Sequence, residues 1–162
     1  MVTASSSALV GAGAVGSALV GGVFFTFSTF VASALRRLPP AEGLPAMQAM
    51  NRAAPSSPLF MLALGGTAVV SAVVAVSAIQ RLDGPAARWE LAASALYLGG
   101  MALTVVYHVP QNEALVRVDP AGVGAVKAWT DYLPAWVAWN HVRTVSALAS
   151  SVAFVLALRT RA

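Results

Sequence analysis

The chain has 162 residues, of which 58% are hydrophobic and 10% are charged, and its mean hydropathy is +0.74. A water-soluble domain carries about 25% charged residues, so this composition predicts a protein that lies in a membrane. The net charge of +4 is scattered rather than gathered in a basic run, which argues against nucleic acid as a partner, and the lack of cysteine excludes thiolate chemistry.

The first predicted element is a membrane helix near residues 8–36. No residue from Ala8 to Leu35 is charged, and the run ends at Arg36 and Arg37. About 20 helical residues cross a bilayer core of about 30 Å, so the run is long enough to span. A cleaved signal peptide would begin with basic residues, and MVTASSSALV has none, so we expect this segment to be retained.

Within this helix the stretch GAGAVG, Gly11 to Gly16, has the spacing of a dinucleotide-binding loop. That fingerprint requires a preceding strand and an acidic residue about 20 positions later, and the run reaches Arg36 without either. Small residues that recur four positions apart instead let two helices approach closely in lipid. We therefore predict that Gly16, Gly21 and Gly22 face other helices.

Three further spans are predicted by the same criteria, near residues 58–80, 90–109 and 136–159. The last apolar run, Thr144 to Leu158, is too short to cross alone, so its span must begin in WVAWNHVR at Trp136. The predicted fold class is all-α, a single domain over residues 1–162 that forms an integral membrane four-helix bundle.

Two long connections, Arg36 to Pro58 and Gln111 to Trp139, lie on one side of the membrane if the helices alternate. Leu44, Met47 and Met50 have helical spacing, so we expect a short interfacial helix in the first connection and a helical segment in the second. Six of the ten lysines and arginines fall on this side, which slightly favours a cytoplasmic location for the long loops in the plasma membrane.

An aromatic stripe runs along the second connection into the fourth span. Its members recur every three or four positions, and we interpret them first as interfacial anchors rather than as a ligand site. They are Trp129, Tyr132, Trp136 and Trp139.

Polar residues gather on the long-loop side, in NR at residues 51–52, YHVPQN at 107–112 and WNHVR at 139–143. Both histidines, His108 and His141, are among them, and antiparallel helices place the two at one depth. Pro110 should end or bend the third helix beside His108. Two interpretations stay open: a structural cluster that seals the end of the bundle, and a functional site.

Three stretches resemble the anthrone oxygenase family of small four-helix membrane proteins: GVFFTFSTFVASALRRLPPAEGLPAMQAMNRAAP, TVVYHVPQNEALVRVDP and WTDYLPAWVAWNHVRTVSALAS. The resemblance extends from about residue 21 to 158 and is carried by Asn51-Arg52, Pro110-x-Asn112 and Trp139-Asn140-His141-x-Arg143. It implies a membrane-embedded oxygenase that converts an anthrone-type methylene of a lipophilic polycyclic phenol to a ketone with dioxygen.

The implied reaction also suggests a role for each matched residue. His141 is the candidate general base, with Arg143 and Asn140 as donors to a developing oxyanion. The deprotonated substrate can supply the electrons, so no cofactor and no metal are expected. The expected partners are the lipid bilayer and a lipophilic aromatic small molecule, and a homo-oligomer is left open. The candidate substrate-binding residues are Asn51, Tyr107, His108, Asn112, Trp136 and Trp139, with Phe27 as a further ring that could stack.

Other classes of function stay open. A non-catalytic membrane scaffold or lipophile-binding protein could use the same polar cluster. A haem- or metal-binding protein could use His108 and His141 as ligands, although no carboxylate or third histidine completes a typical site. An antiporter is disfavoured because the spans hold no acid except Glu90, at an edge.

Overall fold

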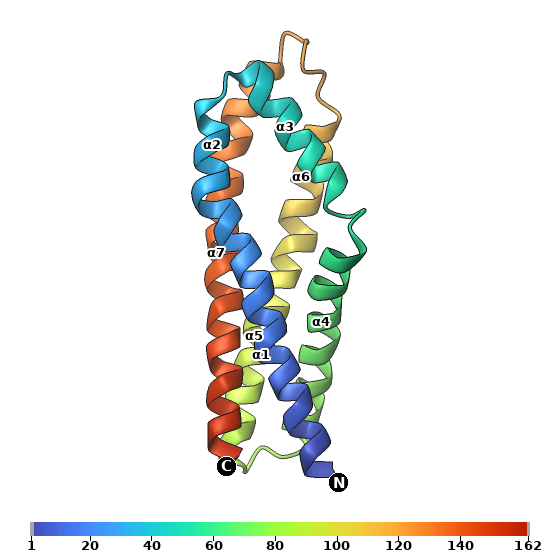
Figure 1. Ribbon diagram of the computed structural model, residues 1–162, viewed down its shortest axis with the longest axis vertical. Coiled ribbons are helices and arrows are strands. Elements are labelled where there is room, and N and C mark those ends of the chain that lie inside the picture. The colour runs from blue at the N-terminus through green and yellow to red at the C-terminus, as the bar shows by residue number, and fades with distance from the viewer. Residues whose placement is uncertain (1, 162) are drawn as a thin grey trace.

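The computed structural model describes residues 2–161, and these residues form helices and short connections without a strand. Four helical segments are long and apolar enough to cross a membrane: Ser6–Arg37, Pro58–Ile79, Pro85–Val116 and Ala125–Thr160. They run side by side along the long axis, with both termini at one end (Figure 1). The predicted all-α membrane four-helix bundle is confirmed.

The spans are built from several elements in chain order. The first span comprises α1 (Val2–Thr26), the π-helical turn η1 (Phe27–Val31) and α2 (Ala32–Arg37). After α3 (Pro40–Ala53), α4 (Pro58–Ile79) forms the second span. The third comprises α5 (Pro85–Leu103), the π-helical turn η2 (Thr104–His108) and α6 (Val109–Val116), and α7 (Ala125–Arg161) is the fourth.

Outward-facing side chains on these helices are largely apolar. Val15, Leu62, Val106 and Val145 are each exposed by more than half of their surface, one on each of the four spans. A protein surrounded by water rarely exposes so much contiguous apolar surface. The outer surface therefore fits association with a lipid bilayer, as an integral membrane protein requires.

Two spans are longer than predicted: the third because Pro110 does not end its helix, and the fourth because the residues before Trp136 are already helical. That helix continues to Val116 rather than stopping at residue 109, and the fourth begins at Ala125 rather than at 136. Pro110 lies in the first turn of α6, directly after η2, where its missing N–H and fixed φ are tolerated. The second long connection therefore holds no separate helix within the described residues, and its helical content belongs to the ends of α6 and α7.

The first long connection does form a helix, α3, and this helix lies across the end of the bundle (Figure 1). Leu44 and Met47 are buried in the same apolar cluster as residues of α7. Gln48 Nε2 donates to the carbonyls of Leu115 (2.9 Å) and Val118 (2.8 Å). These bonds tie α3 to the last turn of α6 and to the residue two positions beyond it, so α3 closes the long-loop end.

The glycine prediction is right at two of its three positions. A Cβ atom at Gly16 would lie 2.2 Å from Thr67 Oγ1, and one at Gly21 would lie 2.7 Å from a methyl group of Leu148. Both glycines therefore face a neighbouring helix, as predicted. Gly22 has no atom within 4 Å of a Cβ, so the prediction is wrong there.

The aromatic stripe of α7 points mainly into the bundle. Trp129, Tyr132 and Trp136 are buried and belong to one apolar cluster, whereas Trp139 is 45% exposed. A helix has 3.6 residues per turn, so positions 129, 132 and 136 share a face and 139 falls at its edge. The interpretation as interfacial anchors is wrong for the three buried members.

Candidate functional site

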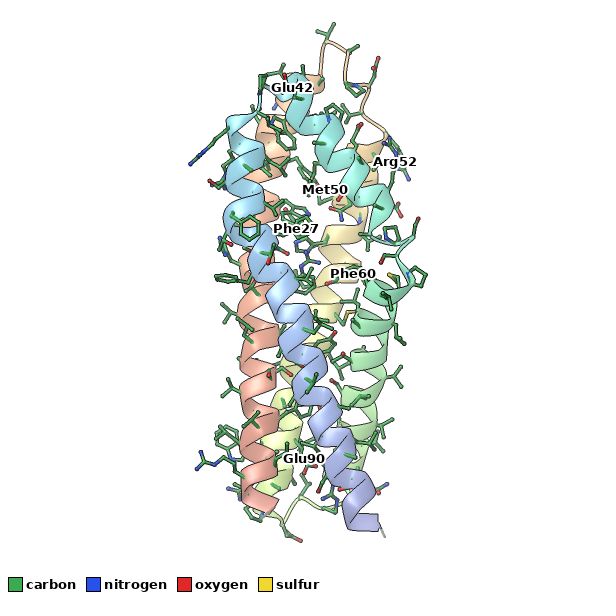
Figure 2. All side chains as sticks on the ribbon, in the orientation of Figure 1. Phe27, Glu42, Met50, Arg52, Phe60 and Glu90 are labelled. Atoms are coloured by element: carbon green, nitrogen blue, oxygen red, sulfur yellow. The ribbon has the colours of Figure 1, made fainter. Side chains whose placement is uncertain are left out.

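A cavity of about 790 Å³ lies at the long-loop end, where α1 and α4 diverge beneath α3 (Figure 1). Its lining comes from α1 and η1, α3, the start of α4, η2 and α6, and α7. Figure 2 shows Phe27, Met50 and Phe60, which line the cavity from η1, α3 and α4. Pockets of about 300–1,000 Å³ are typical of sites for small organic ligands, so the cavity is large enough for one.

Arg143 lines this cavity as a buried cation, 6% exposed. Its Nη1 donates to Thr104 Oγ1 (3.3 Å), its Nη2 donates to Asn140 Oδ1, and its Nε has no partner. The guanidinium carbon lies 4.2 Å from the centre of the Phe24 ring and 5.8 Å from that of Trp136. The ion pairs of the described residues do not include Arg143, so this charge has aromatic faces around it but no carboxylate partner.

The depth of Arg143 makes its burial more significant. Arg143, Phe24 and Leu64 also line one small void inside the bundle, so they lie at about the same level. Leu64 is six positions after Pro58, the start of α4, which is roughly 9 Å along the helix. Charged side chains at this depth in a membrane span are rare and mark functional sites by default.

Asn140 holds the arginine in place. It is fully buried, and its Nδ2 donates to the Phe24 carbonyl (2.9 Å) and to Ser28 Oγ (2.7 Å) while its Oδ1 accepts from Arg143. Both amide hydrogens are therefore engaged with the first span. The bond from Arg143 to Asn140 Oδ1 orients the guanidinium, and no Asn140 hydrogen is left free in this structure for the direct donor role predicted from the sequence.

His108 lines the same cavity and is fully buried. Its ring lies edge-on to Trp136 and Tyr107, with ring centres 5.6 Å and 5.3 Å apart. Neither imidazole nitrogen makes a hydrogen bond of standard geometry, although the ring approaches the backbone of Leu103 and Trp136. Buried polar atoms are normally paired, so this buried imidazole in the cavity wall is a candidate functional group.

The structure does not bring His141 into this cavity, so its predicted convergence with the other polar residues is wrong. His141 is exposed and is not part of the lining. Successive helical residues are about 100° apart, so Asn140 and Arg143 share the inner face of α7 while His141 points outward. His141 and the buried His108 therefore face different surroundings, and nothing in this arrangement supports joint ligation of haem or a metal.

Two predicted aromatic contacts also lie outside the cavity. Trp139 is exposed and Tyr107 is half-buried, and their ring centres are 5.4 Å apart. Neither residue contributes to the lining. They pack on each other on the outer side of α7 and η2, so the structure places them outside the cavity, and their contact with a substrate stays a prediction.

A hydrogen-bonded network lies at the end of the cavity nearest α3. The Tyr132 hydroxyl and Trp136 Nε1 both donate to Asn112 Oδ1, at 2.7 Å and 2.9 Å. Asn51 Nδ2 donates to the Tyr132 oxygen at 3.3 Å. Asn51, Asn112 and Trp136 line the cavity, so the predicted convergence of polar residues from separate segments is right for five of six: Asn51, His108, Asn112, Asn140 and Arg143.

Sequence reasoning missed Phe24, Ser28 and Thr104, which complete the surroundings of Arg143 and Asn140. Helical spacing offered a signal. Phe24 and Ser28 are four positions apart, as are Thr104 and His108, so each pair shares a helix face. Both pairs include a residue of a π-helical turn, η1 or η2, so the two turns flank the cavity.

Comparison with known proteins gives one family. A sequence model described as Anthrone oxygenase matches residues 47–153, about two thirds of the chain. The matched range includes Asn51, His108, Asn112, Asn140 and Arg143, the polar residues that converge at the cavity. No curated protein and no solved structure matches the chain.

Proposed function

Because the chain belongs to the anthrone oxygenase family, we propose that it is a membrane-embedded enzyme that oxidises an anthrone-type methylene of a lipophilic polycyclic phenol to a ketone with dioxygen. The observation that carries this proposal is Arg143, a buried cation without a carboxylate partner on a cavity of about 790 Å³. An acidic aromatic substrate would supply the missing negative charge.

The proposed reaction needs stabilisation of an oxyanion. Loss of one proton from the methylene places negative charge on the conjugated ring oxygen, and the carbanion then transfers electrons to dioxygen. One oxygen atom of dioxygen becomes the ketone and the other leaves as water with the two methylene hydrogens, so atoms and electrons balance. Arg143 would stabilise the oxyanion from a fixed position in a low-dielectric site, where such donors are most effective.

We assign the proton acceptor to His108 rather than to His141. A neutral imidazole is the form that accepts a proton, and His108 is the histidine that lines the cavity, with no standard hydrogen bond from either nitrogen. The flat substrate would lie against Phe27 and Trp136, which pack on each other in the cavity wall with ring centres 6.2 Å apart and a tilt of 59°. His141 faces away from this space.

Oxygen consumption by the purified protein tests the proposal, with anthrone as substrate in detergent or nanodiscs. Loss of a general base lowers rates by about 10²–10⁴, so His108→Gln should fall by that factor. His141→Gln is the matched control, since it removes the chain's other histidine, and it should retain the wild-type rate. The reverse pattern would refute the assignment of the base. Binding of anthrones without oxygen consumption would instead support a lipophile-binding protein.

A further inference from the structure

We propose that Asn51 and Asn112 form a second recognition point, which selects substrates that carry a neutral hydroxyl group remote from the oxygen held by Arg143. This inference rests on the proposed function for the kind of ligand, a polycyclic phenol. It concerns the opposite end of the cavity, and it follows from how the hydrogen-bonded network there fixes the direction of two amide groups.

Trp136 fixes the orientation of Asn112. An indole N–H can only donate a hydrogen bond, so the Asn112 atom that lies 2.9 Å from Trp136 Nε1 must be the amide oxygen. Asn112 therefore cannot flip without losing this bond. Its Nδ2, which has two hydrogens, is directed away from Trp136 and carries no hydrogen bond among the described residues.

The same bond fixes Asn51 through Tyr132. Since Asn112 Oδ1 can only accept, the Tyr132 hydroxyl must use its hydrogen for the 2.7 Å bond to it. The Tyr132 oxygen can then only accept from Asn51, so the atom 3.3 Å away must be Nδ2. Asn51 Oδ1 is left without a hydrogen bond within the described part of the chain.

The network therefore presents one free donor, Asn112 Nδ2, and one free acceptor, Asn51 Oδ1. Both residues line the cavity, and each makes a hydrogen bond with the Tyr132 hydroxyl. A hydroxyl group donates one hydrogen and accepts others, so it can bond to both Asn51 Oδ1 and Asn112 Nδ2. A carboxylate can only accept hydrogen bonds, so it could not bond to the Asn51 oxygen, which would stay unpaired. An alkyl group would leave both asparagines unpaired, which costs binding free energy.

The two polar ends are separated by a distance suited to fused rings. The Arg143 guanidinium carbon lies 5.8 Å from the centre of the Trp136 ring, and Asn112 Oδ1 lies 2.9 Å from Nε1 of the same ring, so the two ends are separated by one indole ring and these two contacts. The cavity wall between them includes Trp136, Phe27 and His108. A flat polycyclic molecule with one oxygen at Arg143 would place its far ring edge toward the two asparagines.

Binding of two matched ligands tests the inference. The first ligand is anthrone, and the second is an anthrone with one added hydroxyl group on the ring edge remote from the ketone. Quenching of tryptophan fluorescence measures the dissociation constant of each ligand. One or two neutral hydrogen bonds should make the hydroxylated ligand bind about tenfold more tightly to the wild-type protein. Asn51→Ala and Asn112→Ala should each bring this ratio of dissociation constants close to one.

The ratio is robust because both ligands are measured on the same variant, so general damage to the cavity cancels. Gln111→Ala is the matched control: this exposed amide next to Asn112 does not line the cavity, and its removal should leave the wild-type ratio. A wild-type ratio near one, or a ratio unchanged in both asparagine variants, would overturn the inference.

Oxygen consumption, measured separately, distinguishes the two proposals. Turnover of both anthrones with a binding ratio near one would overturn the second recognition point and leave the oxygenase function standing. Hydroxyl-dependent binding without oxygen consumption would overturn the oxygenase function and leave the recognition point standing. If neither anthrone binds, both proposals are overturned.

Discussion

Replacing Arg143 with methionine should change the stability of the protein little, while it weakens the binding of an acidic ligand by at least about tenfold. A methionine fills much of the same volume without a charge. Replacing buried charged groups with apolar residues of similar volume is often neutral or stabilising by about 1–4 kcal/mol, because the desolvation cost of the charge disappears. For a functional cation, stability and binding should therefore not fall together.

The contacts of Arg143 set the size of the expected change. Thr104 Oγ1 keeps its bond to the Gly100 carbonyl (2.9 Å) after the replacement, whereas Asn140 Oδ1 loses its partner. An unpaired buried acceptor costs about 1–3 kcal/mol, which largely offsets the gain from removing the charge. The net change in the free energy of unfolding should therefore lie between a loss of about 2 kcal/mol and a gain of about 3 kcal/mol.

Binding should respond far more strongly than stability. A hydrogen bond to a charged group contributes about 1.5–3 kcal/mol, which corresponds to about 10- to 150-fold in the dissociation constant of an acidic anthrone. Arg143→Lys keeps the charge but loses the planar fork, so it should bind more weakly than wild type yet better than Arg143→Met. Thermal unfolding in detergent and tryptophan fluorescence titration measure the two quantities on the same samples.

The outcome decides between the two interpretations that the sequence leaves open. If Arg143→Met fails to fold, or loses more than about 4 kcal/mol, the arginine is part of a structural cluster that seals the bundle. Unchanged affinity for an acidic anthrone in a stable Arg143→Met variant would refute the role of this cation in binding.

Other predictions follow from the packing and the topology. Gly16→Ala should destabilise the protein by about 1–3 kcal/mol through overpacking against α4, whereas Gly22→Ala, which meets open space, should be neutral or stabilising; equal effects on thermal unfolding would contradict this packing. Gln48→Leu should remove the two hydrogen bonds that α3 makes to the carbonyls of Leu115 and Val118 and cost about 1–3 kcal/mol in the same assay, and a variant as stable as wild type would show that these bonds do not stabilise α3. Because the chain lacks cysteine, the single-cysteine variants Ala121→Cys and Asp83→Cys report the membrane orientation. If the long loops are cytoplasmic, an impermeant maleimide should label only Asp83→Cys in intact cells. Labelling of Ala121→Cys instead would show the opposite orientation.

The spans could be predicted from the sequence because length, hydropathy and flanking charges decide whether a helix crosses a bilayer. The boundaries near Pro110 could not, since a π-helical turn beside this proline lets the helix continue, and a turn of that kind has no clear signature in composition. The bonds of Gln48 to the end of α6 were equally hidden, because they join segments far apart in the chain.

The error at His141 had a different origin. The sequence placed Asn140, His141 and Arg143 together as neighbours in one motif, whereas a helix separates neighbours by about 100°. The periodicity of the aromatic stripe indicates the correct assignment. Asn140 and Arg143 follow Trp129 and Trp136 at helical spacing on the inner face of α7, so His141 lies on the outer face. Periodicity on α7 is therefore a better guide to the site than proximity in the sequence.

The two π-helical turns, η1 and η2, bear on how such a site can originate. A π turn contains one more residue than an α turn, so it absorbs a single inserted residue: the residues beyond it keep their faces, and the side chains of the turn itself take new directions. Such an insertion leaves the apolar composition of the span almost unchanged, and membrane insertion tolerates it. A tightly packed four-helix bundle could thus gain an internal chamber through two single-residue insertions in facing helices, and design of membrane enzymes could follow the same route.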